Sequence, residues 1–215
     1  GDDDDTLVGG SGDDALFCHA HTRALQCLPA SRWLVGGSDI DSLYGGDNDD
    51  TLSGGSNADV IDGGAGTDLA DYDGSNAAVT VNLSSAGAQF GGDAQGDVLV
   101  AVENLRGSSF NDTLVGGAGV NAISAGDGDD LVRGNAGADQ LFGGTGQDTL
   151  DYGNSTGAVY VNLLTGTGVD GFGSTDAVTG FEHVVGSTAN DSLVGDSGAN
   201  SLFGLSGLDT LVGND

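Results

Sequence analysis

Positive charge is nearly absent from this sequence. The 215 residues include four cations, all of them arginine, against 33 acidic residues, so the formal net charge is −29. Proteins that recognise nucleic acid need a basic surface to meet the phosphate backbone, and this composition excludes that class of function. A compact chain with this charge also repels itself. We therefore expect folding to require a counter-charge from outside the chain.

Cysteine and long apolar runs are also scarce. The two cysteines, Cys18 and Cys27, are too few for a disulfide framework or a zinc ligand set. No apolar run approaches the ~18 residues of a membrane span, and no signal peptide is visible. Because the sequence has no methionine and begins inside a repeat, we expect it to be a fragment. The hydrophobic fraction of 37% predicts a thin core that is spread along the chain.

Glycine and aspartate are abundant, and they are arranged in a nine-residue repeat. Residues 9–17, GGSGDDALF, follow the pattern G-G-x-G-x-D-x-U-x, in which U is a large apolar residue. The frame recurs at 36–44, 45–53, 54–62 and 63–71, at 107–115, 116–124, 125–133, 134–142 and 143–151, and at 186–194, 195–203 and 204–212. Asn121 and Asn200 replace aspartate at position six, and Ala70 replaces the large apolar residue at position eight. A disordered linker has no reason to keep an apolar residue two places after each aspartate, so the repeat predicts an ordered fold.

Each half of the nonapeptide has its own structural role. Glycine in the first half permits backbone conformations that other residues avoid, which predicts a turn. The x-U-x half predicts a short strand whose central side chain points inward. Two nonapeptides then form one coil of a flattened solenoid, in which residues i and i+18 stack at about 4.8 Å. The predicted apolar ladder contains Leu43, Leu52, Ile61, Leu114, Ile123, Leu131, Leu141 and Leu150.

The position-six aspartates should form a column along each edge of this solenoid. Carboxylates at the spacing of neighbouring strands repel one another, and a cation between successive turns would convert the column into a chain of binding sites. Calcium accepts six to eight oxygen ligands, combines carboxylates with backbone carbonyls and tolerates irregular geometry, whereas magnesium demands a tighter octahedron. The pattern therefore favours multiple Ca²⁺ ions.

This repeat resembles the RTX, or haemolysin-type, calcium-binding family. The resemblance implies an all-β fold, a right-handed parallel β-roll or β-helix solenoid with Ca²⁺ bound in the turns, and a secreted protein that folds on meeting extracellular calcium. The carboxylate ligands that it implies are Asp14, Asp41, Asp50, Asp59, Asp68, Asp112, Asp130, Asp139, Asp148, Asp191 and Asp209, with assistance from Asp13, Asp49 and Asp129 at position five. The implied carbonyl ligands include Gly10, Gly12, Gly46, Gly64, Gly66, Gly144 and Gly146.

A longer repeat is superimposed on the nonapeptides. Asp71-Tyr72 recurs as Asp151-Tyr152, about 80 residues later, and two V-x-V-N-L segments follow at 79–83 and 159–163. We expect one continuous solenoid with a first block at 1–71, a β spacer at 72–106, a second block at 107–151, a second spacer at 152–185 and a third block at 186–215. Loops are expected at 86–96 and 165–174. The two tyrosines could form a binding face or cover a coil edge.

Residues 18–35, CHAHTRALQCLPASRWLV, depart from the repeat in composition but keep its length. Leu25 and Leu34 fall on the apolar position, and Arg23 and Arg32 fall where aspartate belongs. Three interpretations stay open: a compensated reading-frame shift, a cap or insertion in which arginine replaces the metal, and a loop with histidine metal ligands. In each case we expect the coils formed by this segment to lack calcium.

The sequence offers little for catalysis. Without lysine it has no P-loop or Schiff base, and it contains neither H-E-x-x-H nor G-x-S-x-G. We therefore expect a non-enzymatic module of a secreted, extracellular, bacterial protein, which calcium folds and stabilises. The alternatives are an extracellular adhesive stalk or filament that associates end to end, since uncapped solenoids expose strand edges, and an accessory module that binds a polysaccharide or cell-surface ligand.

Overall fold

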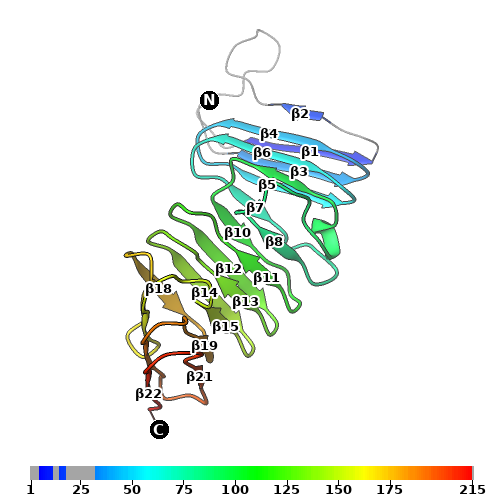
Figure 1. Ribbon diagram of the computed structural model, residues 1–215. Helices are drawn as coiled ribbons and strands as arrows, with labels where there is room; N and C mark the ends of the chain where they lie inside the picture. The colour runs from blue at the N-terminus through cyan, green and yellow to red at the C-terminus, as the bar shows by residue number, and fades with distance from the viewer. Residues whose placement is uncertain (1–4, 12–14, 18–31, 215) are drawn as a thin grey trace.

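The computed structural model describes residues 5–11, 15–17 and 32–214, and within them the fold is almost entirely β (Figure 1). The only helix in these ranges is the 3₁₀ turn η1, Gly92–Ala94. The strands are β1 Asp5–Ser11, β2 Ala15–Phe17, β3 Arg32–Ser38, β4 Ser42–Asp47, β5 Thr51–Ser56, β6 Val60–Ala65, β7 Leu69–Asp71, β8 Thr80–Asn82, β9 Val98–Val100, β10 Asn104–Arg106, β11 Thr113–Val115, β12 Ala122–Asp127, β13 Leu131–Arg133, β14 Gln140–Thr145, β15 Thr149–Asp151, β16 Tyr160–Asn162, β17 Thr167–Val169, β18 Thr175–Thr179, β19 His183–Val185, β20 Ser192–Val194, β21 Ser201–Phe203 and β22 Thr210–Val212. No helix in the described part is long and apolar enough to cross a membrane.

The strands stack as parallel ladders, which confirms the predicted all-β solenoid. Within the nonapeptide blocks, β3 pairs with β5 and β4 with β6, so consecutive strands lie in different sheets and alternate strands are neighbours. Leu34 lies beside Leu52, and Leu43 beside Ile61, which is the spacing of 18 residues expected for one coil. Two nonapeptides therefore form one turn of the solenoid.

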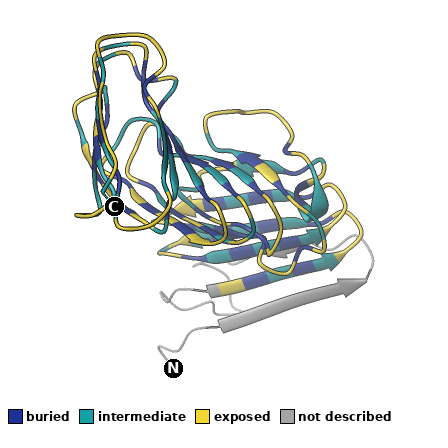
Figure 2. Ribbon diagram, turned by 90° about the horizontal axis from the view of Figure 1, so that it is seen from below, coloured by how far each residue is buried: buried dark blue, intermediate teal, exposed yellow. Residues whose placement is uncertain are grey.

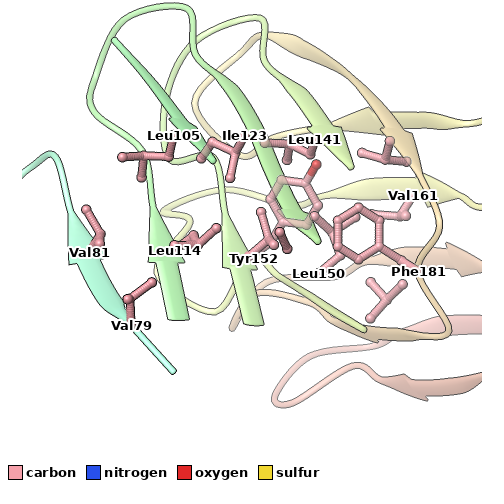
Figure 3. Packing of buried hydrophobic residues seen from close by; sticks show 14 of the residues in the cluster. Val79, Val81, Leu105, Leu114, Ile123, Leu141, Leu150, Tyr152, Val161 and Phe181 are labelled. Carbon is pink, nitrogen blue, oxygen red and sulfur yellow. The ribbon is translucent and has the colours of Figure 1, made fainter. Parts of the chain in front are cut away.

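The core is the apolar ladder that the repeat predicts (Figures 2 and 3). From Leu34 to Leu193 the position-eight residues are completely buried, as in Leu52, Leu114 and Leu141, whereas in the last two nonapeptides Leu202 is partly buried and Leu211 is 47% exposed. Figure 3 shows the row Leu105–Ile123–Leu141 facing the row Val81–Leu114–Leu150. The prediction was wrong at Leu131, because the buried residue of this rung is Val132, with no exposed surface. Val132 occupies position eight, and the side chains of neighbouring residues on a strand point to opposite faces.

At each spacer one of the two stacks of paired parallel strands continues, whereas the other stack ends and a new one begins. In the first spacer β7 pairs with β10, while the ladder β2–β4–β6 ends on β9 and a new ladder begins at β8. In the second spacer β15 pairs with β19, while β18 pairs with β14 and a new ladder begins at β16. The predicted loop at 165–174 instead contains β17, which pairs antiparallel with both β16 and β18. Figure 1 shows a bend in the ribbon at each of these points.

The register also changes across the atypical segment. Leu7 pairs with Leu34, 27 positions later, whereas Leu34 pairs with Leu52 at the usual 18. Leu34 is completely buried, as its predicted apolar position requires. The cysteines, His19, His21, Arg23 and Leu25 lie outside the described residues, so the three interpretations of this segment stay open.

Tyr72 and Tyr152 belong to the core. Each side chain is only 2% exposed and packs in the main hydrophobic cluster. They occupy the places where the first and second spacers begin, immediately after β7 and β15. A binding face formed by these tyrosines is therefore excluded, and their role is inside the solenoid.

Candidate calcium-binding turns

The position-six aspartates lie along the edges of the solenoid, where one carboxylate oxygen ties adjacent coils together. The backbone N–H of Asp41 donates to Asp59 Oδ1 at 2.8 Å, and that of Asp112 donates to Asp130 Oδ1 at 2.7 Å. Asp130 in turn donates its N–H to Asp148 Oδ1 at 2.9 Å. Each bond joins residues 18 apart, so it fixes the orientation of the carboxylate relative to the preceding coil.

The second carboxylate oxygen is buried without a hydrogen-bond partner in many of these turns. Within the described ranges this holds for Asp59, Asp68, Asp130, Asp139 and Asp148, whose Oδ2 atoms accept no hydrogen bond. Leaving a buried acceptor unpaired costs about 1–3 kcal/mol, and more for a charged group. A row of such atoms indicates a partner that is neither a backbone amide nor a side-chain donor of the chain itself.

The glycine at position one brings a carbonyl to the same place. A Cβ placed on Gly36 would lie 2.5 Å from Asp41 Oδ2 and 2.5 Å from the carbonyl oxygen of Gly54, in the next coil. Only glycine fits there, and the space that it leaves receives oxygens from two coils. Carboxylate and carbonyl oxygens are the donors that calcium prefers. The residues of these turns therefore fit calcium in their donor chemistry.

The carboxylates are spread along the edges at one per coil. In the described part of the chain, no group of three or more acidic, histidine or cysteine side chains gathers around a point that could hold a metal ion. A calcium ion in these turns would therefore need glycine carbonyl oxygens as well as carboxylate oxygens among its ligands.

Family comparison agrees with this geometry. The model of the RTX calcium-binding nonapeptide repeat (4 copies) matches residues 1–17, 35–70, 102–132, 115–150 and 176–215, which together make up more than half of the chain. The chain belongs to the RTX calcium-binding repeat family. It is therefore a calcium-binding repeat module, and the unmatched stretches fall mainly on the atypical segment and the two spacers. No curated protein matches the sequence.

Burial and mutual repulsion alter the acidity of the RTX carboxylates. Desolvation, the largest cause, raises the pKa of Asp59 and of Asp68 from the ordinary 3.8 to about 6, and neighbouring carboxylates add to the rise. The pKa of Asp130 and that of Asp139 rise to about 7, again chiefly through burial. The metal-free fold therefore disfavours the charged form of these groups.

These pKa values predict how the calcium-free chain responds to pH. A group whose pKa is higher in the folded state binds its proton more tightly there, so it stabilises the fold below about pH 4. That stabilisation is lost as the pH rises through about 6 to 7. In chelator, we expect far-UV circular dichroism to show more β structure at pH 4 than at pH 8. More β structure at pH 8 would contradict the buried placement of these carboxylates.

The spacers continue the acidic columns with residues that the sequence analysis missed. The N–H of Asp59 donates to Asp97 Oδ1 at 2.9 Å, and that of Asp139 donates to Asp176 Oδ1 at 3.0 Å. On the other edge, Asp68 donates to Glu103 Oε2 and Asp148 to Glu182 Oε2, both at 2.9 Å. All four spacer acids stand two places before an apolar residue, as position six does, and this signal could have identified them.

In the spacers a tyrosine hydroxyl partners the carboxylate oxygen that has no donor in nonapeptide turns such as those of Asp130 and Asp139. Tyr72 Oη donates to Asp97 Oδ2 at 3.0 Å, and Tyr152 Oη donates to Asp176 Oδ2 at 2.7 Å. Burial, followed by the adjacent aspartate, raises the pKa of both tyrosines, so they remain protonated donors. The recurring Asp-Tyr pair thus places a hydrogen-bond donor in each spacer.

Removal of this donor should destabilise the protein. Tyr152→Phe leaves Asp176 Oδ2 buried without a partner, and we expect a loss of about 1–3 kcal/mol in the free energy of unfolding. Urea unfolding in saturating calcium measures the change. Tyr160→Phe is the matched control, because Tyr160 is 39% exposed and accepts only a hydrogen bond from Asn162. Equal losses for the two variants would contradict the role assigned to Tyr152.

The structure places the other predicted ligands as follows. Asp49 and Asp129 at position five are exposed, and each accepts a backbone N–H from the following coil, from Thr67 at 2.8 Å and from Gln147 at 2.9 Å. Asp209, in the final coil, is only partly buried. Gly10 lies in β1. The other described glycines stand at position two of their repeats (Gly46, Gly64 and Gly144) or at position four (Gly66 and Gly146). Gly12, Asp13 and Asp14 lie outside the described residues. The ligand role of each remains a prediction.

Proposed function

We propose that this RTX segment is a calcium-triggered folding module that stabilises a secreted bacterial protein. The observation that carries the proposal is the row of buried carboxylate oxygens without donors along the solenoid edges. A chain with a net charge of −29 gains little from compaction until cations neutralise these edges. Before it meets calcium, such a chain would remain expanded.

Linkage supplies the driving force for this folding step. The carboxylate and carbonyl that converge at Gly36 come from different coils, so the site does not exist in the unfolded chain. A ligand that binds only the folded state adds its binding free energy to folding. High extracellular calcium then favours the folded module after export, without any catalytic step.

Isothermal titration of calcium into the chelator-treated chain tests this proposal. We expect several calcium ions to bind, with a large heat that reflects coupled folding, and little heat from magnesium at the same ionic strength. Absence of calcium binding, or equal binding of magnesium, would contradict it.

A structural stalk is the second candidate, and the internal duplication favours it. The pairing of β7 with β10 and of β8 with β11 is repeated by β15 with β19 and β16 with β20, one super-repeat later. Each unit therefore stacks on the last in the same manner, as a tandem array requires. Negative-stain electron microscopy in calcium should show rods that grow end to end if the segment acts this way, and single short particles otherwise.

A further inference from the structure

The nonapeptide turns are of two kinds, which differ in the backbone at position two. In eight turns this residue has a positive φ, as in Gly126 and Gly144, both at 114°. We name these the open turns; their position-two residues are Gly37, Gly46, Gly55, Gly64, Gly126, Asn135, Gly144 and Leu205. In the closed turns, whose position-two residues are Ser108, Gly117, Ser187 and Asp196, φ is not positive. The count covers the repeats from residue 36 onward.

This difference decides where the position-two N–H points. In the closed turns it donates to the position-six side chain of the same repeat. Ser108 donates to Asp112 Oδ2 at 2.5 Å and Ser187 to Asp191 Oδ2 at 2.6 Å. Gly117 donates to Asn121 Oδ1 at 2.8 Å, and Asp196 donates to Asn200 Oδ1 at the same distance. The closed turn therefore satisfies with its own amide the oxygen that has no donor in the open turns of Asp59, Asp68, Asp130, Asp139 and Asp148.

The two serines strengthen this closure. Ser108 Oγ lies 2.9 Å from Asp112 Oδ1, and Ser187 Oγ lies 2.7 Å from Asp191 Oδ1. Each hydroxyl also accepts the backbone N–H two residues further on, from Phe110 and from Ala189, at 3.1 Å. The carboxylates of Asp112 and Asp191 are thus fully hydrogen-bonded within their own turns. The Oδ2 atoms of Asp130, Asp139 and Asp148 in open turns accept no such bond.

The closed turns have a fixed place in the super-repeat. They are the first two turns after each spacer, and open turns follow them. Both asparagines at position six, Asn121 and Asn200, lie in closed turns. An uncharged side chain is tolerated where an internal N–H already satisfies the oxygen, and it would weaken a site for a cation. The sequence and the hydrogen bonds therefore distinguish the same two groups of turns.

We infer that calcium binds at the open turns and not at the closed turns, so that Asp112 and Asp191 hold their turns together without metal. This inference rests on the proposed calcium-dependent function and divides its sites. Calcium would then occupy separate groups of open turns. Between one group and the next lie a spacer and two closed turns, in which amides and hydroxyls of the protein itself satisfy the position-six side chain.

Counting bound calcium in two matched variants tests this inference. Asp112→Asn and Asp130→Asn make the same change on one edge, in coils joined by the bond from Asp112 N–H to Asp130 Oδ1. Native mass spectrometry of each full chain in calcium gives the number of ions. Asp112→Asn should retain the parent number, and Asp130→Asn should lose at least one ion. Asn121 shows that asparagine is compatible with a closed turn.

The outcomes separate the inference from the function on which it rests. Loss of ions from Asp112→Asn equal to that from Asp130→Asn, with the parent binding calcium, would overturn the inference alone. A parent chain that binds no calcium would overturn both. If circular dichroism shows that Asp112→Asn has not folded, Asp191→Asn, in the closed turn that begins the third block, is compared instead with Asp148→Asn, in an open turn of the second block. In that comparison, retention of ions by Asp191→Asn supports the inference, and loss overturns it.

Discussion

Replacement of Gly144 by alanine should be among the most damaging single changes in this protein. Gly144 has a φ of 114°, which an alanine adopts only with strain, and an added Cβ would collide with the carbonyl oxygen of Gly126 in the preceding coil. Because that oxygen belongs to a paired strand, it cannot move aside freely. We expect a loss of about 2–4 kcal/mol in the free energy of unfolding, measured by urea denaturation in saturating calcium.

Gly119→Ala is the control for this change. A Cβ on Gly119 would meet no atom within 4 Å, and its φ is not positive. We expect its effect to stay within about 0.5 kcal/mol, as is usual for surface substitutions. If the two alanine variants unfolded at the same urea concentration, the result would contradict the close contact between the Gly144 and Gly126 backbones.

Leu141→Ala should have a comparable effect through the core. Leu141 has no exposed surface and lies between Ile123 and Val178 in the ladder. Truncation of a buried leucine to alanine typically costs about 2–5 kcal/mol, from lost burial and the cavity left behind. Phe142→Ala on the same strand is the comparison, because Phe142 is 42% exposed and points to the other face. A larger loss for Phe142→Ala would show that the inward face has been misassigned.

The sequence is informative about this fold because a short repeat with one inward position per strand leaves few choices. The burial of Leu43, Leu52 and Ile61 follows directly from the frame. The error at Leu131 arose where two apolar residues are adjacent, because size favours leucine whereas the frame places Val132 inside. The interruption of one ladder at each spacer could not be foreseen, since it depends on which strands pair across 32 to 38 residues.

The candidate site was predictable in its chemistry and less so in its detail. The frame gives the same expectation for Asp112 as for Asp130, yet Ser108 supplies donors to the first and nothing comparable reaches Oδ2 of the second. Residue type at position two does not distinguish these turns, because glycine occurs there both in a closed turn, as Gly117, and in an open turn, as Gly126. The hydrogen-bonding role of Tyr72 also depends on a contact with Asp97, 25 residues away.

The most direct test of calcium-dependent folding is far-UV circular dichroism of the chelator-treated chain at neutral pH as calcium is added, with magnesium at equal ionic strength as the control. We predict a spectrum of an unfolded chain without metal and a cooperative transition to β structure with calcium alone. A chain that is already rich in β structure in chelator, or one that stays unfolded at millimolar calcium, would contradict the account.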